Sequence, residues 1–229
     1  MSEDAPLNGD LSQRVAVDTT RLAWTASPSG QVERKRLHRV GPQESGQVTS
    51  LVRYLPGASF PEHDHPEGEE IFVLEGVFSD QLGHGTVGMH LLNPEGHRHT
   101  PFSEEGCLIL VKLRQYDGEG RPYRRTETLE MDWSPTDRAG VEEKVLFDEP
   151  AFPDRTVLER WQPGTGSADR TFAGGAELFV IRGELEDADG VHGPGSWLRV
   201  PASAPLALTA RSEAEIYLKT DGVAALLSV

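Results

Sequence analysis

The chain has 229 residues, of which 37% are hydrophobic, and its 37 acidic and 22 basic side chains give a net charge of −15. Such a charge argues against nucleic-acid binding, because there is no basic excess to neutralise phosphates. The length suits one large or two small domains, and the 24 glycines and 16 prolines favour turn-rich β structure.

The first residues of the chain and its single cysteine give indications of the cellular compartment. The first residues, MSEDAPLNGD, are too polar for a signal peptide, and no apolar run reaches membrane-spanning length. We expect residues 1–12 to form a disordered tail. Cys107 has no partner for an intrachain disulfide, and its apolar segment favours a buried core residue over a redox sensor. The sequence therefore predicts a cytoplasmic protein without nucleic-acid or membrane partners.

Short strands follow one another along the chain, and no long stretch has the 3.6-residue apolar period of a helix. We expect turns at PEGHRHTPFSEEG and DADGVHGPG, which are rich in turn-forming residues. The sequence thus predicts an all-β protein. The clearest strand candidates, in chain order, are LVRYLP, EEIFVLEGVF, CLILVKLRQ, TVLERWQ, AELFVIRGEL, SWLRVPA and EIYLKT.

Histidine and glutamate residues gather in the first half of the chain at regular spacings. His63 and His65 are two residues apart, so on a strand both side chains point to the same face. Glu69 lies four residues after His65 and opens a β-prone run, and His99 ends a P-x-G-x-x-H segment that starts at Pro94. Three imidazoles and one carboxylate suit a borderline divalent ion such as zinc, iron, nickel or manganese.

Two of these positions have a neighbour of the same residue type. His97 lies two residues before His99, and the P-x-G-x-x-H spacing selects His99. Glu70 follows Glu69, and both the seven-residue step to Gly76 and the alternation of the strand select Glu69. The other histidines are expected at the surface or in loops: His38, His84, His90 and His192.

These residues resemble the two sequence motifs of the cupins, which are small double-sheet β-barrels. The resemblance implies a jelly-roll-like double-stranded β-helix in which His63, His65, Glu69 and His99 bind one metal ion. The asparagine that usually follows the last histidine by four residues is Ser103 here, which leaves the ligands unchanged. The turn positions of the motifs are matched by Gly57, Gly76, Gly88, Pro94 and Gly96.

A narrower resemblance covers residues 20–120 well and residues 130–220 weakly. The segments GEEIFVLEGVFSDQLGHGTVG and HTPFSEEGCLILVKLRQ are similar to the cupin domain of ChrR-type anti-sigma factors. Those proteins also carry a zinc-binding helical domain with a His-x3-Cys-x2-Cys signature, which this chain lacks because it has one cysteine. The resemblance therefore implies a ChrR-like cupin that does not inhibit a sigma factor.

The chain repeats itself at an offset of about 107 residues. Residues 53–57 resemble 160–164, residues 70–76 resemble 177–183, and residues 32–37 resemble 141–146 at an offset near 109. We expect a bicupin, with a metal-binding barrel at 13–120 and a degenerate barrel at 121–229. In the second copy we expect no metal and an apolar centre filled by Phe172 and Leu206. Its four ligand positions hold Arg170, Phe172, Ala176 and Leu206.

Three functions fit this interpretation. The first is a binding or sensing module for a small molecule, related to oxidative stress, with one divalent ion; zinc is the expected ion, and iron(II), nickel and manganese are alternatives. The second is a metal-dependent dioxygenase acting on a diketone or another enolisable compound. The third is an isomerase or lyase that uses the metal as a Lewis acid. The sequence identifies no catalytic residue outside the ligand set, and the resemblance is compatible with a homodimer.

Overall fold

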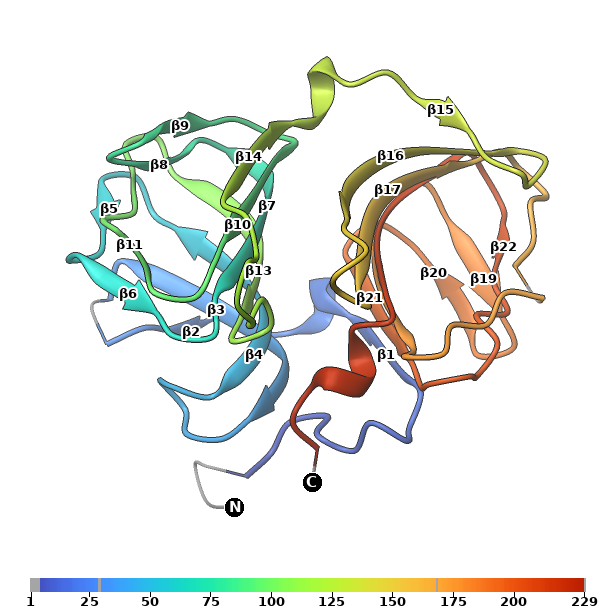
Figure 1. The fold of residues 1–229 in the computed structure, drawn as a ribbon, viewed down its shortest axis with the longest axis horizontal. Helices are drawn as coiled ribbons and strands as arrows, with labels where there is room; N and C mark the ends of the chain where they lie inside the picture. Colours follow the sequence, from blue (N-terminus) through green and yellow to red (C-terminus); the bar gives the residue numbers. More distant parts are fainter. Residues whose placement is uncertain (1–4, 29, 168, 229) are drawn as a thin grey trace. The chain divides into compact units, whose positions relative to one another are not determined.

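The computed structural model describes residues 5–28, 30–167 and 169–228, which form two compact units built mainly from β-strands (Figure 1). The first unit contains the residues up to Gly9 and Ala23–Glu130, and the second contains Asp10–Leu22 and Met131–Ser228. The predicted all-β class is thereby confirmed.

The first unit is built around a seven-stranded antiparallel sheet in the order β14-β10-β7-β13-β4-β3-β2. A four-stranded sheet, β5-β12-β8-β9, and the pair β11-β6 complete the barrel. A short 3-10 turn, η2 (Thr128–Glu130), ends the unit. The strands are β2 (Thr25–Ala26), β3 (Val32–Val40), β4 (Gln47–Tyr54), β5 (Ala58–Ser59), β6 (His63–His65), β7 (Glu69–Gly76), β8 (Phe78–Asp80), β9 (Gly83–Gly85), β10 (Met89–Asn93), β11 (His97–His99), β12 (Phe102–Ser103), β13 (Cys107–Leu113) and β14 (Arg124–Glu127).

The second unit repeats this order of strands. Its seven-stranded sheet runs β1-β21-β18-β23-β17-β16-β15, and a three-stranded sheet, β20-β19-β22, accompanies it. Two 3-10 turns belong to it, η1 (Thr19–Arg21) and η3 (Val223–Ala225). The strands are β1 (Val15–Asp18), β15 (Ser134–Pro135), β16 (Val141–Asp148), β17 (Arg155–Trp161), β18 (Ala176–Arg182), β19 (Leu185–Asp187), β20 (Gly190–His192), β21 (Ser196–Val200), β22 (Thr209–Ala210) and β23 (Ala214–Thr220).

One strand of each sheet comes from the other half of the chain. Strand β1, near the N-terminus, pairs with β21 of the second unit, and β14, in the middle of the chain, pairs with β10 of the first. The predicted boundaries, 13–120 and 121–229, divide the chain by sequence, whereas these two strands pair across that division. Within the predicted tail, residues 1–4 lie outside the described residues, while the backbone of Leu7 pairs with that of Arg39.

Each unit has its own apolar core inside its barrel. Alternate residues of β13, which are Cys107, Ile109 and Val111, belong to the first core, as the two-residue period of a strand requires. In the second unit the same alternation on β23 buries Ala214, Ile216 and Leu218. The residues that line the inside of a barrel are thus those that the sequence alternation selects.

The repeated glycines mark tight turns in both units. Gly76 has a φ of +71°, and a Cβ placed there would lie 2.1 Å from the carbonyl oxygen of Gly106. Gly183 has a φ of +76°, and its Cβ would lie 2.1 Å from the carbonyl oxygen of Glu213. A side chain fits neither place, so the same turn chemistry is needed in both halves.

The expectations for three histidines were wrong, and two segments expected as turns also contain short strands. His38 and His90 are fully buried on β3 and β10, rather than exposed or in loops, and His192 is buried as well. The segments expected as turns contain strands: β11 and β12 in the first unit and β20 in the second. These strands have only two or three residues, which is too short for a clear alternation to appear in the sequence.

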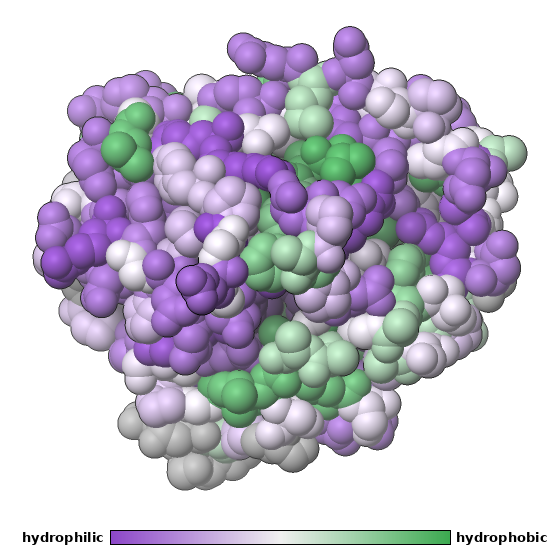
Figure 2. Space-filling model, viewed as in Figure 1, coloured by the Kyte–Doolittle hydropathy of each residue, from purple (hydrophilic) through white to green (hydrophobic). Residues whose placement is uncertain are grey.

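The surface agrees with the acidic composition. Hydrophilic residues cover most of the face seen in Figure 2, and hydrophobic residues appear there in separate patches. In the described part of the chain, no helix has the length and apolar character needed to cross a membrane.

Candidate metal centre

The pairing of β6 with β11 brings histidines together. In this antiparallel pair His63 lies opposite His99 and His65 lies opposite His97, so all four imidazoles start from one face. The ligand atoms of His63, His65 and His99 lie within 4.8 Å of one another. This cluster comes from two segments more than thirty residues apart in the chain, joined by three-residue strands.

The geometry of the three histidines fits a metal ion. The Nε2 atoms of His65 and His99 are 2.9 Å apart, close to the roughly 3.0 Å between neighbouring ligands at right angles with bonds of about 2.1 Å. Nδ1 of His63 lies 2.9 Å from the carbonyl oxygen of Pro61, so when Nδ1 donates this hydrogen bond, Nε2 keeps its lone pair. Burial lowers the pKa of His65, which favours the neutral imidazole that binds metals.

Glu69 lies beside this cluster at the start of β7. Its Oε2 is 3.4 Å from Nε2 of His65 and 3.6 Å from Nε2 of His99. The Nδ2 group of Asn93, which is fully buried, donates a hydrogen bond of 2.8 Å to the same oxygen and fixes its position. Glu70 instead pairs with His90, with 2.9 Å between its Oε1 and the Nε2 of that histidine. Adjacent glutamates thus point to opposite faces, as the strand alternation predicts.

A second layer of charged groups supports His99. Oδ2 of Asp80 lies 3.6 Å from Nδ1 of His99, and Oδ1 accepts hydrogen bonds from the amide of Leu82 at 2.8 Å and from Nη1 of Arg125 at 3.0 Å. Burial opposes ionisation of Asp80, but the nearby imidazole of His99, the hydrogen bond from the amide of Leu82 and the charge of Arg125 hold its pKa below the ordinary value. A carboxylate behind a ligating histidine orients the ring and makes it a better ligand.

Sequence reasoning missed Asp80, Asn93 and Arg125. They come from β8, β10 and β14, and only the pairing of these strands brings them to the histidines. An aspartate that precedes a turn residue is common for reasons of local hydrogen bonding, so its spacing carried no signal for a metal site.

His97 stands apart from the three-histidine cluster. Its ring stacks on Tyr123 with 5.0 Å between centroids and an interplanar angle of 19°. Burial lowers the pKa of His97. This arrangement accords with the choice of His99 over His97.

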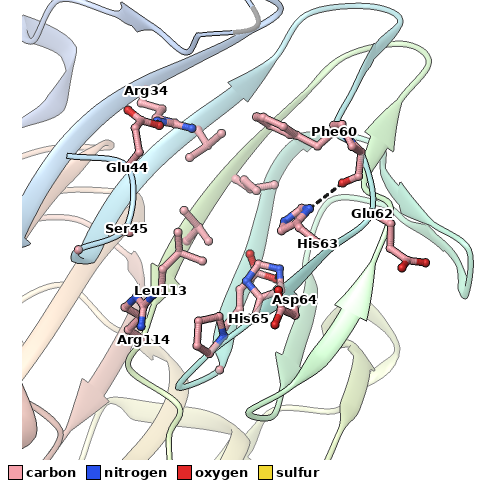
Figure 3. A pocket seen from close by; sticks show the side chains of 18 of the residues that line it. Arg34, Glu44, Ser45, Phe60, Glu62, His63, Asp64, His65, Leu113 and Arg114 are labelled. Carbon is pink, nitrogen blue, oxygen red and sulfur yellow. Dashed lines mark hydrogen bonds and ion pairs between the residues drawn. The ribbon is translucent and has the colours of Figure 1, made fainter. Parts of the chain in front are cut away.

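A cavity of about 540 Å³ opens beside the cluster (Figure 3). His63, His65 and Glu69 form part of its lining, and Arg34, Glu44 and Arg114 contribute charges elsewhere on it. The apolar part of the wall consists of Val52, Tyr54, Phe60, Ile109, Val111 and Leu113.

Tyr54 is the one phenol on this wall among the described residues. Burial, with the nearby charge of Glu69, raises its pKa well above the ordinary value, so the group stays protonated. Its ring meets Phe60 and Phe78 edge to face, with centroids 5.8 and 5.9 Å away. These contacts fix the ring in place beside the cavity.

The corresponding positions of the second unit hold different chemistry. Leu206, in the place of His99, is a fully buried core residue, and Phe172, in the place of His65, packs against the same core. Arg170, in the place of His63, donates two hydrogen bonds of 2.8 Å to the carboxylate of Glu159, which also accepts one of 2.7 Å from Nε1 of Trp161. The expected apolar filling is therefore accompanied by an ion pair between a partly buried arginine and a buried carboxylate, which the sequence did not reveal.

Cys107 belongs to the first core. Its side chain is buried, and burial raises the pKa of its thiol to about 11. The reactive thiolate is therefore scarce at neutral pH, which supports a core role over redox sensing.

Comparisons with known proteins agree with this architecture. A family model described as the ChrR cupin-like domain matches the chain twice, at residues 12–117 and 123–223. No curated protein sequence matches the chain.

Solved structures share the tandem fold at low sequence identity. A candidate dioxygenase from Nostoc punctiforme is 15% identical with a TM-score of 0.72, over 93% of this chain and 84% of its own. A candidate glyoxylate-induced protein from Pseudomonas aeruginosa is 12% identical with a TM-score of 0.72, over 92% and 89%. Salicylate 1,2-dioxygenase from Pseudaminobacter salicylatoxidans is 14% identical with a TM-score of 0.67, over 93% and 86%. At such identities the likeness is one of fold, and the predicted bicupin fold is confirmed.

Proposed function

Because the chain belongs to the ChrR cupin-like family, we propose that its first barrel holds one divalent metal ion through His63, His65, Glu69 and His99. The site binds a small molecule with oxygen donor atoms in the adjoining cavity. The observation that carries this proposal is that two of the clustered imidazoles and Glu69 lie on the wall of a cavity of about 540 Å³. A cavity of this size suits a small ligand.

We propose further that the reaction is dioxygen-dependent cleavage of an enolisable compound. Iron(II) in this site would supply both the Lewis acidity that favours an enolate and the electrons that activate dioxygen. The chain's own residues position the substrate and exclude water: Val52, Ile109 and Val111 form an apolar wall, and the protonated Tyr54 is available to donate a hydrogen bond.

Two of the structural neighbours give this reaction class some support. One is described as a candidate dioxygenase, and another is a salicylate 1,2-dioxygenase that has also been solved in adducts with gentisate. Salicylate and gentisate are named for that neighbour and are not assigned to this chain. For this chain the neighbours support a metal-dependent oxygenase reaction without naming the compound.

Elemental analysis and an oxygen electrode test this proposal. Protein purified without added metal should contain close to one divalent ion per chain. After loading with iron(II), it should consume dioxygen with at least one member of a panel of diketones and related enolisable compounds. Iron-loaded protein that consumes no dioxygen with any of them would exclude the proposed reaction.

A binding or sensing module without catalysis is the second candidate function. The observation that favours it is the family match itself, since both halves of the chain match a cupin-like domain named for ChrR. In that case the natural ion is zinc, and small molecules bind without turnover. Zinc in the purified protein, together with an absence of oxygen uptake after iron loading, would favour this module over the oxygenase.

Three further proposals concern the rest of the molecule. We propose that the second barrel, at residues 121–229, binds no metal and has a structural role, whereas the first barrel, at residues 13–120, holds the metal. A cytoplasmic location and a homodimer also remain proposals. Metal analysis tests the first point, and two ions per chain would contradict it. Cell fractionation tests the location, and light scattering tests the homodimer.

A further inference from the structure

Two arginines of β3 are joined to one glutamate at the edge of the metal-site cavity. Nη1 of Arg34 donates a hydrogen bond of 2.7 Å to Oε2 of Glu44, and Nη2 of Arg36 donates one of 3.1 Å to Oε1. Nη2 of Arg36 also donates to the carbonyl oxygen of Gln43 at 3.0 Å. Each oxygen of one carboxylate is therefore held by a different guanidinium group.

The two arginines are fixed, while the glutamate is exposed. The side chains of Arg34 and Arg36 are 21% and 14% exposed, and both belong to a nine-residue strand. Glu44 is 49% exposed and lies on the hairpin loop between β3 and β4. An ion pair with an exposed partner contributes little free energy. Another carboxylate can therefore replace Glu44 with a small loss of stability.

The arginines also face the space that a ligand of the metal centre would occupy. Arg34 and Glu44 line the large cavity together with His63, His65 and Glu69. In Figure 3, Arg34 and Glu44 lie on one side of the cavity, and His63 and His65 lie on the other. Arg36 lines a smaller recess of about 60 Å³, whose wall shares Arg34, Glu44, Val52 and Val111 with the large cavity. A ligand lying along the apolar wall therefore has histidines at one end and guanidinium groups at the other.

The second barrel provides an internal comparison. Arg34 lies opposite Val52 in the register of β3 and β4, and the corresponding pair in β16 and β17 is Glu143 opposite Glu159. At the place of Arg36 the second barrel has Val145. The arginine pair thus occurs in the half that carries the histidine cluster, and is replaced by an acid and an apolar residue in the half that does not.

We propose that Arg34 and Arg36 bind a carboxylate group of the ligand, and that Glu44 occupies this place when the ligand is absent. The inference rests on the proposed function and narrows its substrate class to a small enolisable carboxylic acid. Its enolisable oxygens lie at the histidine end, and its carboxylate lies at the arginine end. Two guanidinium groups that each donate to one oxygen match a carboxylate better than they match a neutral group.

Binding to the zinc-loaded full-length chain tests the proposal without any turnover, because zinc has no redox chemistry. The probes are 4,6-dioxoheptanoate, a diketone with a remote carboxylate, and its methyl ester, which has the same carbon skeleton without the charge. By calorimetry, the acid should bind about tenfold more tightly than the ester. Arg34→Gln should abolish this preference and leave the affinity for the ester within about twofold.

Glu44→Gln provides a test in the opposite direction. The substitution removes the competing charge, so the affinity for the acid should rise several-fold, while the affinity for the ester stays the same. Arg53→Gln is the matched control, because Arg53 is on the neighbouring strand, pairs with Glu33 and lies outside the cavity lining. It removes the same charge and should leave the preference for the acid unchanged.

Several results would overturn the inference. These are equal binding of acid and ester, no binding of the acid, a preference that survives Arg34→Gln, or weaker binding of the acid to Glu44→Gln. Failure of the proposed oxygenase reaction appears separately, as an absence of oxygen uptake by the iron-loaded protein. Preferred binding of the acid without oxygen uptake would support the carboxylate site and exclude the reaction.

Discussion

The two barrels of this chain share their framework and differ in their centres. Both have the same order of seven strands, and both close a turn with a glycine that no larger residue can replace, Gly76 and Gly183. In the first, a cluster of three histidines has two members, His63 and His65, on the wall of a cavity. In the second, Leu206 fills the core and Arg170 pairs with Glu159. Strand pairing and turn geometry therefore maintain the barrel, while the residues at its centre are free to change.

The largest expected difference between the barrels concerns metal content. His99→Ala should reduce the metal from about one ion per chain to nearly none, because the residue is one of the three clustered histidines and is buried. His97→Ala is the matched control and should retain the metal, since that ring stacks on Tyr123 instead. Elemental analysis after gel filtration measures both. Equal losses in the two variants would show that the wrong histidine was chosen.

The next effect concerns the stability of the second barrel. Arg170→Ala leaves the buried carboxylate of Glu159 without its ion pair, which should destabilise that barrel by about 3–5 kcal/mol. Denaturant unfolding measures the change, and the metal content should stay the same. A double variant, Arg170→Leu with Glu159→Gln, should recover part of the loss, because the amide carries no charge and its oxygen still accepts the hydrogen bond from Trp161. A loss below about 1 kcal/mol for Arg170→Ala would mean that the pair is not buried in solution.

Much of this comparison could be predicted from the sequence. The spacings from His63 to His99 and the repeated glycines are local features, and they identified the histidine cluster and the two barrels. The charged residues behind them could not be predicted. Arg125 meets Asp80 because β14 adds to the sheet beside β10, and Arg170 meets Glu159 across the interior of the barrel. Such contacts join segments far apart in the chain, so the residue spacing within either segment does not indicate them.

His38 and His90 show a second limit of the sequence. Each alternates away from the apolar core, a pattern that usually marks an exposed residue. Both are nevertheless buried, and polar partners make this tolerable: Oε1 of Glu70 lies 2.9 Å from Nε2 of His90, and the carbonyl oxygen of Asn8 lies 3.1 Å from Nδ1 of His38. A polar residue in a strand pattern does not reveal whether such a partner exists.

A smaller effect separates two equivalent aspartates. Asp80→Asn removes the carboxylate behind His99 and should weaken metal binding by about 10- to 100-fold, the usual range for such supporting groups. Asp187→Asn makes the same change at the corresponding place in the second barrel and should leave metal affinity unchanged. Competition with a chelator of known affinity measures both. Similar metal affinities for Asp80→Asn and the unmodified chain would exclude a supporting role for Asp80.

The smallest effect is the pH dependence of Asp187. Burial opposes its ionisation, but contacts with His192, the amide of Asp189 and Arg14 hold its pKa below the ordinary value. Its ionised form therefore stabilises the folded state above the carboxyl pKa of the unfolded chain, and this contribution is lost as the pH falls through the folded pKa. Asp187→Asn should cost about 1–2 kcal/mol at pH 7 and nothing at strongly acid pH. A difference in unfolding free energy that stays constant with pH would contradict this.

The exchange of strands β1 and β14 has a consequence for how such a chain arose and how it can be divided. A single barrel with this connectivity would need the first strand of a second copy to complete its sheet, as in a strand-swapped dimer. Joining two copies head to tail turns that exchange into an intramolecular one, in which the partner strand is always present at high effective concentration. Cutting the chain near residue 120 therefore separates β1 from β21 and β14 from β10, so each seven-stranded sheet loses its end strand. Two co-expressed fragments can restore these pairings only by associating with each other.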